Sequence, residues 1–257
     1  MSNKPLVTIV TPSYNQGLFI EKTILSVLNQ SYRNIQYILV DGGSTDNTMD
    51  TVNKYRDKID IVIHEKDNGQ ADAINKGFIL AQGELAGWLN SDDILYPECV
   101  ERIVELYSQK PDGSIFYNRN GRIINYMDEK VRDYKKFIPD GNYLLTKKYD
   151  VLQQGSFYRT DILQKVNYLD PTIYYCMDLD LWLKLSKYGP IYSLDLPPLS
   201  AFRIWENSKT FTGGLKFLKN IREVLLRNGA AFYSKTVIIT YWYGIKSVVK
   251  KAFKSKA

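Results

Sequence analysis

The sequence predicts an α/β protein built around a mostly parallel, doubly wound sheet with helices on both faces. Short runs rich in Val, Ile and Leu alternate with segments whose apolar residues recur at helical spacing, over about the first 110 residues. Short polar loops join these elements. Parallel neighbours in a sheet need a crossover, usually a helix, so this alternation favours a parallel sheet covered on both faces. At 257 residues the chain is long enough to bury a full core.

The predicted strands of the first half cover residues 6–11, 35–40, 60–64 and 83–89. Each is a short apolar run that ends at a polar loop, as strands commonly do. Helices are expected over residues 18–30, 47–55, 71–81 and 97–110, because their apolar residues share one face. In a doubly wound sheet the loops after the strands converge on one edge, where ligands bind.

The second half is less regular. Strands are expected over residues 115–118 and 122–126, separated by a turn at 119–121, and a helix over 160–166. Leu179, Trp182, Leu183 and Leu185 suit a further buried helix that begins near Asp178. Residues 128–148 are polar, aromatic and aperiodic, so no element is assigned to them.

Two adjacent carboxylates, Asp92 and Asp93, follow the fourth strand in the run Asn90-Ser91-Asp92-Asp93. Neighbouring carboxylates repel each other, and a hard divalent cation such as Mg²⁺ or Mn²⁺ relieves that repulsion. The same run is also common as an Asx turn that caps a following helix. From these residues alone, a metal site and a structural turn are both possible.

Several classes of site are disfavoured. No Gly-x-Gly-x-x-Gly follows the first strand and no Gly-Lys-Ser/Thr loop occurs, which argues against a dinucleotide fold and a P-loop. His64 is the single histidine, so a zinc site is not expected. Cys99 and Cys176 give no disulfide framework, and without a signal peptide we expect free thiols in a reducing compartment.

The formal charge of +6 belongs to the end of the chain. No acidic residue follows Glu223, whereas seven Lys and Arg residues do. Residues 215–227 and 232–256 combine these cations with apolar and aromatic residues at helical spacing. Such a segment is typical of helices that lie in an anionic membrane interface. The alternative is a pair of helices docked on the rest of the protein with a solvated lysine edge. No recognised nucleic-acid module accompanies the charge, so no nucleic-acid partner is expected.

The polar loops of the first half resemble the signatures of family 2 glycosyltransferases, which have the GT-A fold. The matching stretches are residues 7–15 (Val-Thr-Ile-Val-Thr-Pro-Ser-Tyr-Asn), 40–48 (Val-Asp-Gly-Gly-Ser-Thr-Asp-Asn-Thr) and 89–93 (Leu-Asn-Ser-Asp-Asp). Residues 69–77 (Gly-Gln-Ala-Asp-Ala-Ile-Asn-Lys-Gly) are similar to a block of one bacterial branch. Four ordered blocks make a far more specific match than one motif.

The resemblance implies a nucleotide-sugar site, with a UDP-sugar as the default donor. Asp41 would lie by the nucleobase and ribose, and Asp92 and Asp93 would hold the ribose and a diphosphate-bound Mn²⁺ or Mg²⁺. The donor-binding residues expected from the matching blocks and from the family's closing segment are Pro12, Ser13, Tyr14, Asp41, Asp72, Asn90, Asp92 and Arg203. Arg203 and Lys209 are the candidate cationic partners of the diphosphate, and for Lys209 a solvated surface position is an equal alternative.

Three positions depart from the family pattern. Many relatives have a second Asp where this chain has Gly42, and an Asp where it has Asn90. The first difference leaves the donor's base open, and the second lowers the charge available to a metal. Relatives often carry a His that reaches the metal or the diphosphate where this chain has Trp205.

Asp178 is the expected catalytic base. Sugar transfer with inversion needs a carboxylate beside the acceptor hydroxyl, and the run Asp178-Leu179-Asp180 resembles the family motif that supplies it. The alternative is a carboxylate that caps a helix, and a base can occupy that position too. Asp180 is expected to be structural. Residues 153–159 resemble the family's acceptor-site floor, or form a Gly-hinged loop.

Together these observations predict a GT-A catalytic domain over residues 1–212 and a basic amphipathic helical tail over 213–257. The nucleotide-sugar half would cover about 1–118 and the acceptor half about 119–212. The expected activity is inverting transfer of a sugar to a hydroxyl of a saccharide, or lipid-linked saccharide, in surface polysaccharide synthesis. The expected location is cytoplasmic, peripheral on the inner face of the cell membrane. The alternatives are a nucleotide-sugar-binding protein without activity and a sugar nucleotidyltransferase.

Overall fold

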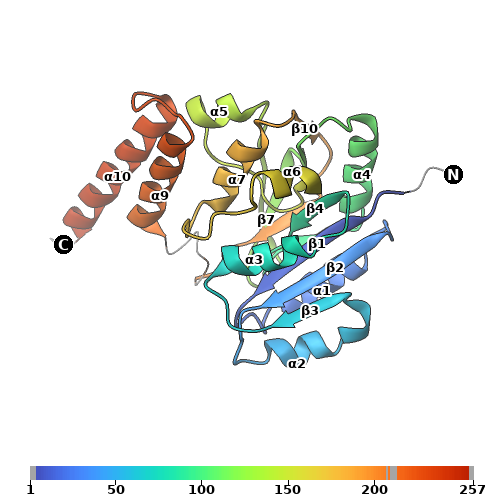
Figure 1. Ribbon diagram of the computed structural model, residues 1–257. Coiled ribbons are helices and arrows are strands. Elements are labelled where there is room, and N and C mark those ends of the chain that lie inside the picture. Colours follow the sequence, from blue (N-terminus) through green and yellow to red (C-terminus); the bar gives the residue numbers. More distant parts are fainter. Residues whose placement is uncertain (1–3, 207, 209–212, 255–257) are drawn as a thin grey trace.

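A computed structural model describes residues 4–206, 208 and 213–254 (Figure 1). Among these residues the main sheet has seven strands. In spatial order they are β10 (Ile191–Leu194), β6 (Ile115–Asn118), β9 (Phe157–Arg159), β4 (Leu85–Trp88), β1 (Val7–Ser13), β2 (Ile35–Asp41) and β3 (Ile61–His64). Only β9 runs antiparallel to its neighbours in this sheet. The predicted mostly parallel sheet is therefore confirmed.

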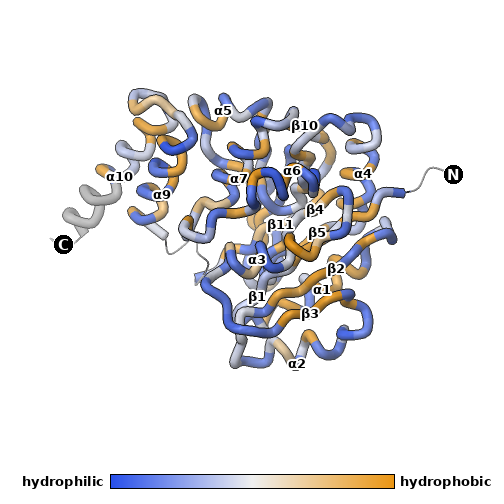
Figure 2. Tube along the Cα trace, in the orientation of Figure 1, coloured by the Kyte–Doolittle hydropathy of each residue, from blue (hydrophilic) through white to orange (hydrophobic). Residues whose placement is uncertain are grey.

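Helices cover both faces of this sheet, because alternate strand residues point to opposite sides. Ile38 and Val40 of β2 pack into one buried cluster, and Tyr37 and Leu39 into another. The first cluster includes α3 (Gln70–Ile79), α6 (Thr160–Lys165) and α7 (Met177–Leu185), and the second includes α1 (Ile20–Leu28), α2 (Thr48–Asn53) and α4 (Cys99–Gln109). A 3₁₀ turn, η1 (Arg56–Lys58), follows α2. Figure 2 shows the central strands as hydrophobic runs, which suits burial on both faces.

A smaller sheet was not predicted as a unit. Its order is β5 (Ile94–Leu95), β11 (Ser200–Arg203), β7 (Asn120–Ile124) and β8 (Lys130–Lys135). β7 begins inside the turn expected at residues 119–121, and β8 and α5 (Gly141–Thr146) lie in the stretch to which no element was assigned. Because β11 pairs with β5, a strand near the end of the predicted catalytic domain lies beside β5. The loop that precedes β5 carries Asp92 and Asp93, and we call it the acidic loop.

The tail forms two helices, α9 (Gly214–Arg227) and α10 (Lys235–Lys254), which pack side by side at one edge of the molecule (Figure 1). α9 also packs on α7, and α10 on α5. Val237 of α10 is fully buried, and the Thr236 hydroxyl donates to the Leu145 carbonyl of α5. The alternative given for the tail, two helices docked on the rest of the chain, is therefore present in this structure.

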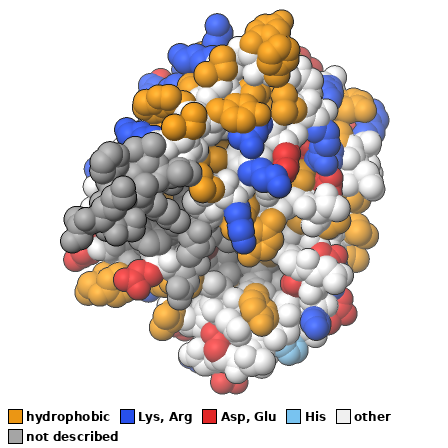
Figure 3. Space-filling view, turned by 90° about the vertical axis from the view of Figure 1, so that its left-hand side faces the viewer, with side chains coloured by type: hydrophobic (Ala, Val, Ile, Leu, Met, Phe, Trp, Pro, Cys, Tyr) orange, Lys and Arg blue, Asp and Glu red, His pale blue; other side chains and the backbone are white. Residues whose placement is uncertain are grey.

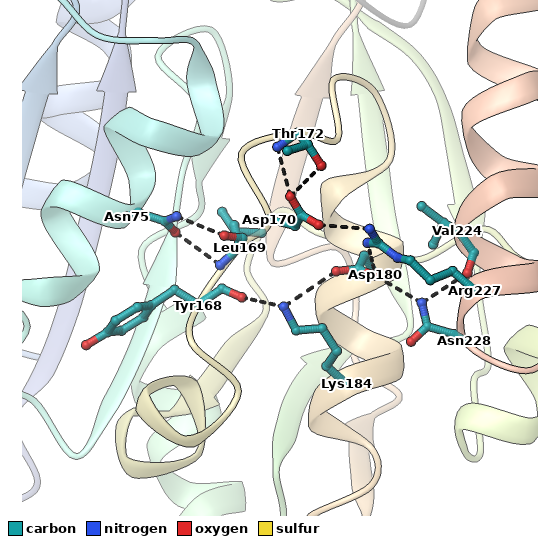
Figure 4. Close-up of polar contacts among 10 residues, drawn as sticks. All are labelled: Asn75, Tyr168, Leu169, Asp170, Thr172, Asp180, Lys184, Val224, Arg227 and Asn228. Carbon is teal, nitrogen blue, oxygen red and sulfur yellow. Dashed lines mark hydrogen bonds and ion pairs between the residues drawn. The ribbon is translucent and has the colours of Figure 1, made fainter.

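Arg227 at the end of α9 anchors this contact (Figure 4). Its guanidinium donates to Asp180 of α7 at 2.9 Å and to Asp170 at 2.8 Å. The Asn228 amide also donates to Asp180, at 2.9 Å. Asp180 is 1% exposed, so it has the structural role that the sequence suggested. A buried carboxylate needs such partners, because an uncompensated charge away from water is costly.

The division of the chain at residue 212 stays a prediction, since residues 209–212 lie outside the described part of the structure. In the described residues, no helix has both the length and the apolar character that crossing a membrane requires. Cys99 and Cys176 are buried free thiols, in agreement with expectation.

Candidate functional site

The loops that follow β1 and β2 are held together by hydrogen bonds. The backbone N–H of Asn15 donates to the Ser44 hydroxyl at 2.7 Å, and the Asn15 side-chain oxygen accepts from the Thr45 N–H at 2.9 Å. The Asp46 carboxylate accepts from the Gly17 N–H at 3.0 Å. These contacts hold polar loops at the carboxyl ends of the strands, where open α/β sheets bind ligands.

A cavity of about 460 Å³ opens at this edge of the sheet. Among the residues expected in the site, Pro12, Ser13, Tyr14, Asn90, Asp92 and Asp178 line it. Asp67, Gln70, Gln153, Gln154 and Trp205 line it as well, although no site role was expected for Asp67 or Gln70. The Ser13 hydroxyl, buried in this wall, has no hydrogen-bond partner among the described residues. A buried polar group without a partner inside the protein is suited to bind a polar ligand.

Asp92 and Asp93 differ in what their carboxylates contact. Asp93 is fully buried and does not line the cavity. Its Oδ1 accepts from the Arg203 N–H at 2.9 Å, and its Oδ2 accepts from Gln154 and Asn90, each at 3.1 Å. Asp92 lines the cavity, and its Oδ2 accepts from the Trp205 indole N–H at 2.9 Å. Burial raises the pKa of both carboxyls, and the charge of Asp92 raises the pKa of Asp93 further.

Of the two adjacent carboxylates, only that of Asp92 has an oxygen atom left to bind a divalent cation in this structure. Its Oδ1 has no hydrogen bond to another described residue, whereas both oxygens of Asp93 are taken by N–H donors. The described residues contain no group of three His, Cys, Asp or Glu side chains that could hold a metal ion. Mg²⁺ and Mn²⁺ sites on nucleotides often use one protein carboxylate, with water and phosphate completing the shell. Of the two expected metal ligands, Asp92 thus faces the cavity and Asp93 holds the loop from inside the protein; the metal site itself stays a prediction.

Arg203 is also placed differently from expectation. It is fully buried and does not line the cavity. Its Nε donates to the Asp92 carbonyl and its Nη1 to the Asn125 carbonyl, both at 2.8 Å, and its Nη2 lies 2.6 Å from Asp128. The guanidinium also lies 4.8 Å from the centre of the Phe19 ring. Arg203 therefore holds the acidic loop from inside the protein instead of facing a diphosphate. Lys209 lies outside the described residues.

Asp41 and Asp72 organise loops and do not line the cavity. Asp41 is fully buried, accepts from the Gly43 and Ser44 N–H groups and lies 2.7 Å from the His64 ring nitrogen. Asp72 accepts from the Asn68 N–H at 2.9 Å, near the start of α3. Each carboxylate accepts from backbone donors that a turn leaves unpaired, and the expected contacts of both with the donor stay predictions.

Asp67 occupies the space beside Gly42, where many relatives carry a second Asp. A Cβ atom added to Gly42 would lie 2.3 Å from Oδ2 of Asp67. Asp67 lines the cavity, and its Oδ1 accepts from the Gly69 N–H at 2.8 Å. The loop after β3 thus brings a carboxylate to the space beside Gly42 of the loop after β2. The contact joins residues 25 positions apart, so no local sequence pattern indicates it.

An amide network supports the acidic loop. The Gln70 amide donates to the Asn90 side-chain oxygen at 2.8 Å, and Gln153 donates to the Trp88 carbonyl at 2.7 Å. Asn90 is therefore engaged on its oxygen, which leaves it poorly placed to coordinate a metal. Gln153 and Gln154 line the cavity, and Gly155 beyond them adopts φ +74°. The expected Gly-hinged loop is present at Gly155, whereas the role of residues 153–159 as the floor of the acceptor site stays a prediction.

Asp178 lies in the first turn of α7 and lines the same cavity as Asp92. Its Oδ1 accepts from the Leu179 N–H at 2.8 Å. Burial raises the pKa of this carboxyl, and the positive charge of Lys136 partly offsets the rise. A carboxylate with a raised pKa in a ligand cavity is suited to take a proton.

Two solved structures are similar to this chain in fold. Staphylococcus aureus TarS, residues 1–349, in complex with UDP-GlcNAc has a TM-score of 0.69 at 16% identity, over 95% of this chain and 71% of that one. The mannosyltransferase PcManGT from Pyrobaculum calidifontis, in complex with GDP-Man and Mn²⁺, has a TM-score of 0.66 at 15% identity, over 100% and 76%. These likenesses show that the chain has the GT-A fold.

Curated relatives cover part of this chain. The putative teichuronic acid biosynthesis glycosyltransferase TuaG of Bacillus subtilis is 41% identical over 111 residues, which are 42% of this chain and 44% of TuaG. Two uncharacterised glycosyltransferases of Rickettsia are 28% identical over 197 residues, or 73% of this chain. The chain spans 61% of the length of these two proteins.

The family model described as Glycosyl transferase family 2 matches residues 8–166. The match covers β1 to α6, including the loops of the cavity that carry Ser13, Asp67 and Asp92. More than half of the chain lies inside it, and the chain therefore belongs to glycosyl transferase family 2.

Proposed function

We propose that this protein is an inverting, metal-dependent glycosyltransferase that moves a sugar from a nucleoside-diphosphate donor to a hydroxyl of a saccharide. The observation that carries the proposal is that Asp92 and Asp178 line one cavity at the carboxyl edge of the parallel sheet. The complexes of TarS with UDP-GlcNAc and of PcManGT with GDP-Man and Mn²⁺ support a nucleotide-sugar donor. The name of TuaG supports an acceptor of surface polysaccharide synthesis.

In this proposal, some residues of the cavity bind the donor and others bind the acceptor. The walls formed by Ser13, Asp67 and Gln70 would bind the nucleotide, and Asp92 would hold Mn²⁺ or Mg²⁺ through its Oδ1. When bound, the cation supplies Lewis-acid stabilisation of the diphosphate that leaves. Trp205 donates to the other oxygen of Asp92 and so fixes the direction of Oδ1. Arg203 and Asp93 hold the loop that carries Asp92 through hydrogen bonds inside the protein.

Asp178 would take the proton of the acceptor hydroxyl. The acceptor oxygen then forms a bond to C1 of the sugar while the bond from C1 to the phosphate oxygen breaks, and the nucleoside diphosphate leaves on the opposite face. At C1 one bond therefore forms and one breaks. The proton moves from the acceptor hydroxyl to the Asp178 carboxylate and remains there. A carboxylate whose pKa is raised by burial holds a proton better than an exposed one, which suits this step.

Thermal unfolding with UDP, GDP, dTDP and CMP, each with Mn²⁺ and with EDTA, tests the donor site. We expect one nucleoside diphosphate to stabilise the protein in a metal-dependent manner, by about 2.7 kcal/mol at a concentration 100 times its Kd. The Asp92→Asn variant should lose the dependence on metal. A folded wild-type protein that responds to none of the nucleotides would contradict the proposed donor site, and with it the glycosyltransferase activity.

We also propose that α10 binds the anionic inner face of the cell membrane. Ile238, Tyr241, Trp242 and Ile245 follow one another at i, i+3, i+4 and i+7, and each is at least half exposed. Lys246 lies 5.1 Å from the Trp242 ring centre. Figure 3 looks at this side of the molecule and shows exposed hydrophobic side chains beside Lys and Arg. An apolar stripe with flanking cations suits an interface that is both apolar and negatively charged.

Sedimentation with vesicles tests the membrane contact. We expect the protein to bind phosphatidylglycerol vesicles at low salt and to bind phosphatidylcholine vesicles much less, because only the first carry net negative charge. The Trp242→Ser, Ile245→Ser double variant should bind about tenfold or more weakly, since two apolar side chains leave the interface. Tyr188→Ser, which removes an exposed aromatic ring after α7, is the matched control. Equal binding by the double variant and this control would exclude α10 as the membrane contact.

A further inference from the structure

A second cavity, of about 530 Å³, adjoins the donor cavity. Asp178, Gln153, Gln154 and Phe202 line both of them, so the expected base lies where the two meet. The outer wall of the second cavity comes from β8 and the residues just after it, and from α7 and α9. We call it the acceptor cavity, because Asp178 lines it and Asp92 does not.

β8 turns a set of basic and aromatic side chains toward the acceptor cavity. Successive residues of a strand alternate between its faces, so Arg132, Tyr134 and Lys136 share one face. All three line the cavity. Tyr134 pairs with Gly121 of β7, and a Cβ on Gly121 would lie 2.5 Å from the Tyr134 ring. Because Gly121 has no side chain, the Tyr134 ring has room to lie against β7. Along the chain, Tyr134 stands between Arg132 and Lys136.

The cations of the cavity wall differ in their partners. Lys136 lies 3.1 Å from the Asp150 carboxylate, and Lys135 lies 2.7 Å from Asp195. The backbone of Arg132 pairs with Ile123 of β7, whereas its side chain has no hydrogen bond or ion pair to another residue among those that the structure describes. Charged side chains on an edge strand also discourage aggregation. Lys130, on the same strand, fits that role, because it lies outside the cavity and pairs with Asp133.

We propose that the acceptor cavity binds a saccharide that carries an anionic group, and that Arg132 is the main partner of that group. The inference rests on the glycosyltransferase activity proposed above. A guanidinium pairs with a carboxylate or a phosphate through two parallel hydrogen bonds, and the exposed Arg132 side chain can make this contact without first losing another partner. A uronic acid and a sugar phosphate share this oxyanion chemistry. Lys136 also lines this cavity but already pairs with Asp150, which leaves Arg132 as the cation available to a ligand among the described residues of the wall.

Titrations followed by NMR distinguish the two sources of the anion. The protein is saturated with diamagnetic Mg²⁺ and the nucleoside diphosphate that stabilises it, which blocks the donor cavity. Methyl glucuronide, glucose 1-phosphate and neutral methyl glucoside are then compared. We expect one anionic probe to bind at least tenfold more tightly than methyl glucoside, because a hydrogen bond to a charged group contributes about 1.5–3 kcal/mol. A preference for the glucuronide indicates a carboxylate, and a preference for the phosphate indicates a phosphate.

Two variants with the same change of charge decide whether Arg132 is responsible. Arg132→Gln should remove the preference for the anionic probe, and Lys130→Gln on the same strand should keep it. Equal affinities of the wild type for all three probes, or a preference that survives in Arg132→Gln, would overturn the inference. The thermal response to the nucleotide is measured on the same samples. A failure of nucleotide binding contradicts the proposed function, whereas nucleotide binding without a preference for an anion contradicts only this inference.

Discussion

Asp178→Asn is expected to lower kcat for sugar transfer by about 10²–10⁴-fold, the usual contribution of a general base. The amide keeps the shape of the side chain but cannot accept the proton of the acceptor hydroxyl. It can still accept the hydrogen bond from the Leu179 N–H, so the start of α7 should keep its structure. Thermal stabilisation by the nucleotide should therefore be close to that of the wild type.

The pH dependence follows from the burial of Asp178. Burial raises the pKa of this carboxyl above its ordinary value, and Lys136 is the charged group that offsets part of the rise. Its neighbours Tyr158 and Cys176 have raised pKa values and stay neutral. The base works only when deprotonated, so kcat at saturating donor should fall as the pH falls through the raised pKa and level off above it.

The control for this prediction is Asp57→Asn, which makes the same change at an exposed position in η1, outside both cavities. It should leave kcat and the pH profile unchanged. If Asp178→Asn retains kcat within a few-fold of the wild type, another group accepts the proton and Asp178 has only a structural role at the start of α7.

Arg203→Met is expected to lower the free energy of unfolding by about 3–5 kcal/mol, the usual result of removing one partner from a buried charged network. The fully buried guanidinium joins the Asp92 and Asn125 carbonyls and the Asp128 carboxylate. Met fills part of the volume but leaves these oxygen atoms without their donors. Because one of them belongs to Asp92, nucleotide binding should weaken as well.

Urea unfolding measures this change, and Arg122→Met is its matched control. Arg122 lies on β7, the neighbour of β11, and pairs with Asp133 on the partly exposed side of the same small sheet. Its removal should change stability little, because exposed ion pairs contribute little. Equal losses in the two variants would show that the buried network does not support the acidic loop. A loss confined to Arg203→Met, with weaker nucleotide binding, would confirm it.

Local patterns in the sequence were sufficient to predict the main strands and helices and the parallel sheet that they form. Strands and helices are recognisable over a few residues, because a buried strand is a short apolar run and an amphipathic helix repeats every 3.6 residues. The parallel sheet follows from their alternation, and the convergence of the loops follows from the sheet. Hence Ser13, Asn90 and Asp92 could be expected in one region from the sequence alone, whereas Asp178 was assigned to the site through the family resemblance. The small sheet was missed because β5 and β11 are short and pair across distant parts of the chain.

The orientation of each carboxylate depended on contacts between residues far apart in the sequence. Asp92 and Asp93 are adjacent and look equivalent in the chain, yet a partner more than a hundred positions away takes an oxygen of each. In the same way, Arg203 turns inward to Asp128, and Asp67 fills the space beside Gly42. A buried polar group must find its partner wherever the fold brings one, so its final direction is a property of tertiary packing and not of local sequence.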